Sequence, residues 1–165
     1  MATQSPIVPN DSLTLSSSLQ KPPLPRDCTF AESDWRALAP HWYPVAFSQE
    51  VKDKPYAARL LDERVVVYRL TDGKIVAAKD ICYHSGAPLS LGSVEGDEII
   101  CKYHGLRYNA SGQCTCIPAH PKGAISPRLR LHMLRAQEAF GLVWVQLIED
   151  DEVKLPVMKE WSDPE

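Results

Sequence analysis

The chain has 165 residues, of which 44% are hydrophobic and four are Trp, so it is long enough to fold as one domain around a packed core. Its formal net charge of -3 argues against a general nucleic-acid-binding surface, which would be strongly basic. No stretch approaches the roughly 18 consecutive apolar residues of a membrane span, and no secretory signal is visible. We therefore expect neither nucleic acid nor membrane as a partner.

The first predicted segment, residues 1–29, is a disordered leader. Serines run together at 16–18, prolines follow, and apolar periodicity is missing. A short helix is predicted from Ala31 to Leu38, with Ser33 as its cap and Pro40 ending the run. At the other end, residues 151–165 are acidic and aperiodic, which predicts a linker or tail.

Between the two ends, residues 30–150 are predicted to form one domain of short strands. The expected strands are 42–47, 57–61, 65–70, 74–79, 98–101, 107–108, 113–117, 129–136 and 142–147. Turn signals separate them at Thr71-Asp72-Gly73, Glu95-Gly96-Asp97, Asn109 to Gly112 and Glu138 to Gly141. Short strands at this spacing, with little helix, indicate an all-β fold, an antiparallel β sandwich or barrel.

The decisive motif consists of two short Cys-then-His loops. Cys82-Tyr83-His84 is followed, after 16 intervening residues, by Cys101-Lys102-Tyr103-His104. In a Rieske-type [2Fe–2S] cluster one iron takes two Cys and the other takes two His, so paired loops can each give one ligand to each iron. Cys82, His84, Cys101 and His104 are therefore the predicted metal ligands and cofactor-binding residues. No catalytic residue is predicted.

Two alternatives remain open from the residues alone. Two Cys and two His can also bind one zinc ion tetrahedrally, although zinc fingers usually pair Cys with Cys and His with His along the chain. Alternatively, the pattern is a coincidence of buried Cys and ordinary His. Glycines near both loops (Gly86 and Gly105) disfavour coincidence, because they let the backbone turn tightly beside a cluster.

The remaining cysteines and histidines are predicted to be ordinary packing or surface residues. Cys114 and Cys116 lie two apart on a predicted strand and should share a face. The others are Cys28, His41, His120 and His132. Lys102, Arg107 and Lys122 are a candidate basic rim that would attract an acidic electron donor. Free thiolates for metal binding favour a reducing compartment, so a cytoplasmic location is expected.

Five segments together resemble the N-terminal domain of Rieske non-haem iron oxygenases. They are Trp42-Tyr43-Pro44-Val45-Ala46, residues 82–92, Tyr103-His104-Gly105, Cys116-Ile117-Pro118-Ala119 and Gly141 to Val145. The likeness covers roughly residues 35–150 and is greatest to the vanillate demethylase and phthalate dioxygenase oxygenase components. It implies a Rieske (ISP-like) fold in which residues near 80–118 form a small cluster-binding subdomain on the β sandwich.

The resemblance also implies a role in electron transfer. An NAD(P)H-dependent flavin or iron–sulfur reductase would supply electrons to the cluster. The electrons would pass to a mononuclear Fe(II) in an oxygenase catalytic domain or subunit, with a homo-oligomer as one form of assembly. The acid-and-two-His motif of that iron site does not occur here, so this chain alone is not expected to oxidise substrate. The alternative function is a free-standing Rieske-type ferredoxin.

Departures from the family pattern occur at Ser85, Lys102 and Leu106. Rieske proteins of cytochrome complexes resemble this chain less. They carry an extra Cys in each loop and a Ser that bonds a cluster sulfur, where Tyr103 and Leu106 stand here. Fewer hydrogen bonds to sulfur predict a reduction potential at the low end of the Rieske range of about -150 to +300 mV.

Overall fold

The computed structural model describes residues 22–158 and consists of two antiparallel sheets with one short α-helix. The elements in chain order are α1 (Glu32–Leu38), β1 (Tyr43–Phe47), a 3-10 helix (Ser48–Glu50), β2 (Tyr56–Leu60), β3 (Glu63–Arg69), β4 (Ile75–Lys79), a 3-10 helix (Leu89–Leu91), β5 (Ser93–Glu95), β6 (Glu98–Ile100), β7 (Arg107–Asn109), β8 (Cys114–Cys116), β9 (Met133–Ala139) and β10 (Leu142–Gln146). The all-β prediction is confirmed. No helix within the described residues has the length and apolar character needed to cross a membrane.

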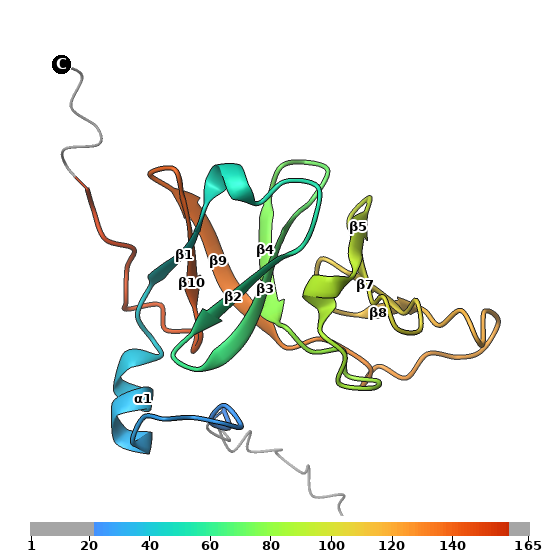
Figure 1. The fold of residues 1–165 in the computed structure, drawn as a ribbon, viewed down its shortest axis with the longest axis horizontal. Helices are drawn as coiled ribbons and strands as arrows, with labels where there is room; N and C mark the ends of the chain where they lie inside the picture. The colour runs from blue at the N-terminus through green and yellow to red at the C-terminus, as the bar shows by residue number, and fades with distance from the viewer. Residues whose placement is uncertain (1–21, 159–165) are drawn as a thin grey trace, which may run out of the picture.

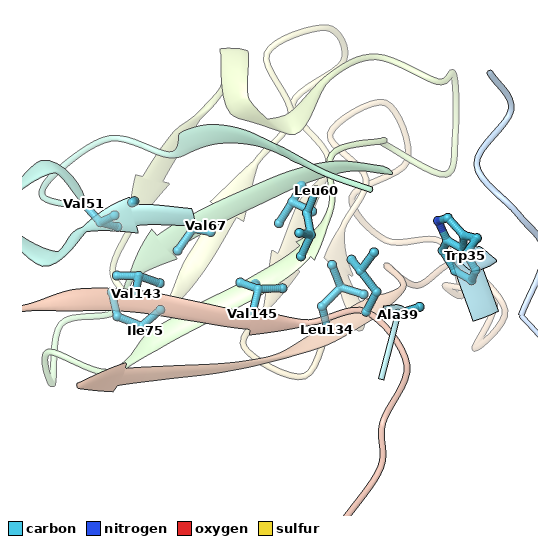
Figure 2. Close-up of a cluster of buried hydrophobic side chains, with 13 residues drawn as sticks. Trp35, Ala39, Val51, Leu60, Val67, Ile75, Leu134, Val143 and Val145 are labelled. Carbon is cyan, nitrogen blue, oxygen red and sulfur yellow. The ribbon is translucent and has the colours of Figure 1, made fainter. Parts of the chain in front are cut away.

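The larger sheet has six strands in the order β1-β10-β9-β4-β3-β2 and forms the sandwich. All six strands send apolar side chains into one core, to which α1 adds Trp35. Figure 2 shows this core, with Leu60, Val67, Val145 and Leu134 gathered in the space between the strands. The indole N–H of Trp35 also donates to the carbonyl of Leu61 at 2.9 Å, which fixes the helix against the sheet.

The smaller sheet, β5-β6-β7-β8, lies within the residues 80–118 predicted as a subdomain, and it stands beside the sandwich on the right of Figure 1. A second core joins the two sheets. On β3, Val65 and Val67 face the first core while Val66 and Tyr68 face the second, because neighbouring residues of a strand point to opposite sides. This explains the unbroken apolar run of β3: its central part is buried on both faces.

Tight turns close the predicted hairpins. Gly73, at φ +88°, closes β3 to β4, and Gly112, at φ +79°, closes β7 to β8. The Asn109 side-chain oxygen accepts the backbone N–H groups of Ser111 and Gln113, as expected for Asn in a turn.

The first strand of the last hairpin lies later in the chain than the sequence predicts. The strand predicted at 129–136 begins at Met133 and runs to Ala139. Residues 129–131 instead lie against the β7–β8 hairpin, where the Leu131 N–H donates to the carbonyl of Gly112. The turn that follows β9 needs only Phe140 and Gly141, both at positive φ. The sequence also missed β5, because three residues carry too little periodicity.

The chain ends also differ from a simple leader and tail. Residues 22–29, placed in the leader by composition, make defined contacts: the backbone N–H and hydroxyl of Thr29 both donate to the Asp62 carboxylate. Near the other end, the indole N–H of Trp42 donates to the carbonyl of Val153. The rest of the predicted leader, 1–21, and of the tail, 159–165, lies outside the described residues.

Candidate metal centre

Both predicted ligand loops have the same backbone hydrogen-bonding pattern. In the first, the Cys82 carbonyl accepts the N–H of Gly86 at 2.8 Å, and the Cys82 N–H donates to Ala87 at 2.8 Å. In the second, the Cys101 carbonyl accepts the N–H of Gly105 at 2.9 Å, and the Cys101 N–H donates to the carbonyl of Leu106 at 2.9 Å. Each glycine lies at positive φ, +75° and +69°, as the tight turns require.

The structure brings the four predicted ligands together as two pairs. The Cys82 and Cys101 thiols are each 1% exposed and interact with one another. The His84 and His104 rings are exposed, with centroids 4.9 Å apart and planes at 70°. No group of three or more His, Cys, Asp or Glu within residues 22–158 converges as a site for one metal ion. The site therefore has a buried sulfur side and an exposed nitrogen side.

Backbone hydrogen bonds and burial act in opposite directions on the pKa of the Cys101 thiol. Burial raises the pKa of Cys101, while the backbone N–H groups of Tyr103 and His104 lower it, and the nearby Cys82 thiol raises it further. Those N–H groups point toward sulfur and would favour a thiolate there. A metal ligand at this position thus has hydrogen-bond donors prepared for it.

Tyr108 is a site residue that the sequence placed only on a strand. It is fully buried on β7, and its hydroxyl lies 3.3 Å from the Cys82 sulfur. Burial, followed by the contact with Cys82, raises the pKa of the Tyr108 hydroxyl far above its ordinary value. The sequence shows only a Tyr four positions after His104 on a predicted strand, and it carries no sign of the contact with Cys82.

Asp80, directly after β4, ties the beginning of the first loop to its end. Its carboxylate is 4% exposed and accepts the backbone N–H of Ser90 at 2.8 Å and the Ser90 hydroxyl at 2.7 Å. Arg64 lies 3.8 Å away and supplies a positive charge at the surface. This buried carboxylate connects the end of β4 to the 3-10 helix at 89–91, so it closes the stretch that carries Cys82 and His84.

Cys114 and Cys116 share a face of β8 as predicted, with Cys114 buried and Thr115 between them exposed. Cys114 lies in the second core with Cys82 and Cys101, and its sulfur contacts the Cys116 carbonyl at 3.6 Å. It thus packs beside the thiol pair.

The other singled-out residues lie elsewhere. Cys28 packs against the first core, and His41, His120 and His132 lie in loops, where they are exposed. Arg107 of the expected basic rim is engaged by two carboxylates, those of Glu95 at 2.6 Å and Glu98 at 3.3 Å.

Known proteins are similar to this chain in sequence and in fold. Methylxanthine N1-demethylase NdmA of Pseudomonas putida is 35% identical over 130 residues, which is 74% of this chain and 37% of that protein. The vanillate O-demethylase oxygenase subunit of a Pseudomonas strain is 34% identical over 125 residues, 74% of this chain and 34% of that protein. The solved structure of NdmA from P. putida CBB5 superposes with a TM-score of 0.74 at 33% identity, covering 79% of this chain and 42% of that one.

This chain spans about a third of the length of the curated relatives it matches. Residues 41–137 match the family described as the Rieske [2Fe-2S] domain, and this range includes both paired loops, the whole smaller sheet, and β1 to β4 of the larger sheet. The cofactor of that family is the Rieske-type [2Fe–2S] cluster. The donor set fits this cofactor, because two thiols and two imidazoles stand in separate pairs. The chain therefore belongs to the Rieske [2Fe–2S] domain family.

Proposed function

We propose that Cys82 and Cys101 hold one iron, and His84 and His104 the other iron, of a Rieske-type [2Fe–2S] cluster. The observation that carries this proposal is the pairing of like donors: thiol beside thiol, ring beside ring. One zinc ion would need all four donors around a single point. When bound, the cluster takes up and releases one electron at a time, at a higher potential than clusters with four thiolates.

Different residues of the chain bury, hydrogen-bond and expose different parts of this site. The second core buries the Cys82 and Cys101 sulfurs, which keeps water away from them. The backbone N–H groups after Cys101 and the Tyr108 hydroxyl act on sulfur as hydrogen-bond partners. His84 and His104 stand at the surface, so their rings form the shortest path between the site and a docked protein.

We further propose that the chain is the Rieske electron-transfer domain of a Rieske non-haem iron oxygenase. In this role it relays single electrons from an NAD(P)H-dependent flavin or iron–sulfur reductase to a mononuclear iron centre on another domain or subunit. The names of the relatives support an oxygenase component over a free-standing ferredoxin: a demethylase and an oxygenase subunit align over 74% of this chain. The free thiols support a cytoplasmic setting.

Ligand variants with matched controls test the assignment. Cys101→Ala and His104→Ala should lose bound iron and its visible absorption, after anaerobic preparation. Cys116→Ala and His120→Ala remove the same residue types from β8 and from the loop after it, and should keep both the iron and the absorption. If the controls lose iron as completely as the ligand variants, or the ligand variants keep it, the assignment is wrong.

The relay is tested on the loaded chain. A reductase of the stated class with NADH should reduce it by one electron per chain, and an added oxygenase catalytic component should reoxidise it. A loaded chain that exchanges electrons with neither protein would contradict the proposed role.

A further inference from the structure

Charge is unevenly distributed along the chain around the two ligand loops. The chain as a whole has a net charge of -3, yet residues 99–132 contain no Asp or Glu. The same stretch carries five basic residues: Lys102, Arg107, Lys122, Arg128 and Arg130. This stretch runs from β6 through the second ligand loop to the residue before β9, so the positive charge belongs to the part of the chain that carries this loop.

Most of these positive charges are not neutralised. Of these five, only Arg107 forms ion pairs with other described residues, namely Glu95 and Glu98. Within residues 22–158, no ion pair involves Lys102, Arg128 or Arg130, and all three side chains are exposed. A solvated face of a protein usually mixes both signs. An unpaired patch of one sign instead acts as an attractive field for an oppositely charged partner.

The same region exposes large apolar side chains. Tyr83 is 65%, Leu91 63% and Tyr103 67% exposed, and two of these adjoin the exposed His pair along the chain. The Tyr103 ring lies against the His104 ring, with centroids 4.0 Å apart. Exposed apolar groups concentrated at one place mark interaction surfaces more often than scattered single ones.

Two shallow hollows connect the apolar and basic groups. One, of about 360 Å³, is lined by Leu91, Lys102 and Tyr103, with Ala87 and Pro88. The other, of about 510 Å³, is lined by Tyr83 together with Arg128 and Arg130. Apolar contact near the centre with charge around it is the usual composition of a transient protein interface.

We infer that this surface docks an acidic electron-donor protein, with carboxylates around an apolar contact patch. The surface, here termed the docking tip, comprises Tyr83, Leu91, Lys102, Tyr103, Arg128 and Arg130. The inference rests on the proposed function, since Tyr83 and Tyr103 of the tip directly precede the two histidines proposed to bind iron. It differs from the rim expected from sequence, because Arg107 is neutralised and Arg128 and Arg130 take its place.

The expected behaviour follows from the length over which charge acts. Steering by opposite charges raises association rates by one or more orders of magnitude at low ionic strength. The effect vanishes near 1 M salt, where the screening length is about 3 Å. Apolar contact does not depend on salt in this way, so Leu91 and the arginines should differ in their salt dependence.

The test uses the cluster-loaded chain and a reduced plant-type [2Fe–2S] ferredoxin of acidic surface as donor, mixed by anaerobic stopped flow. Arg128→Glu with Arg130→Glu should slow the second-order reduction rate about tenfold or more at low salt. Lys52→Glu with Lys54→Glu is the matched control, with the same change in charge at exposed lysines before β2. The control should change the rate less than about twofold. If the paired Glu substitutions prevent loading, Arg128→Gln with Arg130→Gln replaces them, with a smaller effect in the same direction.

Leu91→Ser should slow the reaction at high salt as well as at low salt. The inference is overturned if the arginine variants match the lysine control at every ionic strength. It is also overturned if they change only the oligomeric state in sedimentation, because the surface then joins copies of this chain. Redox titration of each variant separates the proposals: a chain without a titratable cluster contradicts the proposed function, whereas normal titration with unaltered donor kinetics contradicts only the docking tip.

Discussion

Replacing Tyr108 by Phe removes one oxygen atom next to the proposed sulfur ligand Cys82. The ring is fully buried and would stay in place, because Phe fills the same space without the hydroxyl. That hydroxyl lies 3.3 Å from the sulfur. A metal-bound thiolate carries no proton, so the hydroxyl must be the donor in the loaded chain. Its hydrogen bond strengthens when the site gains an electron, which favours the reduced form.

The size of the effect can be estimated from this one bond. A net hydrogen bond contributes about 1 kcal/mol, and a tenfold change in a one-electron equilibrium corresponds to about 59 mV. Tyr108→Phe should therefore lower the reduction potential by roughly 40 mV. The assay is a mediated redox titration of the anaerobically loaded variant beside the parent chain.

Tyr68→Phe provides a matched control. Tyr68 is equally buried in the same core, and its hydroxyl has no hydrogen-bond partner among the described residues. Its removal should leave the potential unchanged and stabilise the fold by about 1 kcal/mol, since an unpaired buried polar group is lost. A potential that shifts equally in both variants, or rises in Tyr108→Phe, would refute the hydrogen-bond account.

Three further substitutions test other parts of the structure. Leu106→Ser should raise the reduction potential by adding a hydroxyl next to the second ligand loop, as redox titration would show. Gly92→Ala should prevent normal pairing of β5 with β6, because an added Cβ would collide with the carbonyl oxygen of Ile100, and loss of bound iron would report it. Glu138→Gln should make urea stability less dependent on pH below about 5, since the hydrogen bond from Arg69 lowers the pKa of Glu138.

The sign for Glu138 follows from its depressed pKa. Its stabilising contribution is complete above the ordinary carboxyl value and is lost as pH falls through the lower folded value. Glu152→Gln is the control, because that side chain forms no ion pair among the described residues and should leave the pH profile unchanged. Gly96→Ala is the control for Gly92→Ala: it is strained at φ +60° but meets open space, so iron should remain bound. An unchanged potential in Leu106→Ser, iron retained in Gly92→Ala, or parallel pH profiles in Glu138→Gln would contradict the respective explanations.

The sequence predicted much of the fold because its signals were local. Turn residues such as Gly73 and Gly112 marked hairpins that the structure confirms. The apolar run of β3 was recognised as a strand, but burial on both faces depends on a second sheet that contacts it only in three dimensions. The displaced start of β9 has the same origin, since residues 129–131 are held by the distant β7–β8 hairpin.

In the candidate site too, local patterns were predictable from the sequence, and contacts made only in three dimensions were not. The residue types and spacing of the two Cys-then-His pairs, at 82–84 and 101–104, were enough to propose two ligand loops. The role of these four residues as ligands stays a prediction. Tyr108 could not be singled out, because its meaning depends on a sulfur 26 positions away in sequence. The basic rim was predicted only in part: Arg107 is neutralised by carboxylates from β5 and β6, and pairings across a sheet are invisible in a charge count.

The most direct measurement combines metal and sulfide analysis with magnetic resonance of the reduced chain carrying ¹⁵N-labelled histidine. We predict a cluster of two irons and two acid-labile sulfides in each chain, with two histidine nitrogens coupled to the unpaired electron. Material prepared without oxygen that contains zinc and no sulfide, or an iron–sulfur centre with no coupled nitrogen, would contradict this prediction.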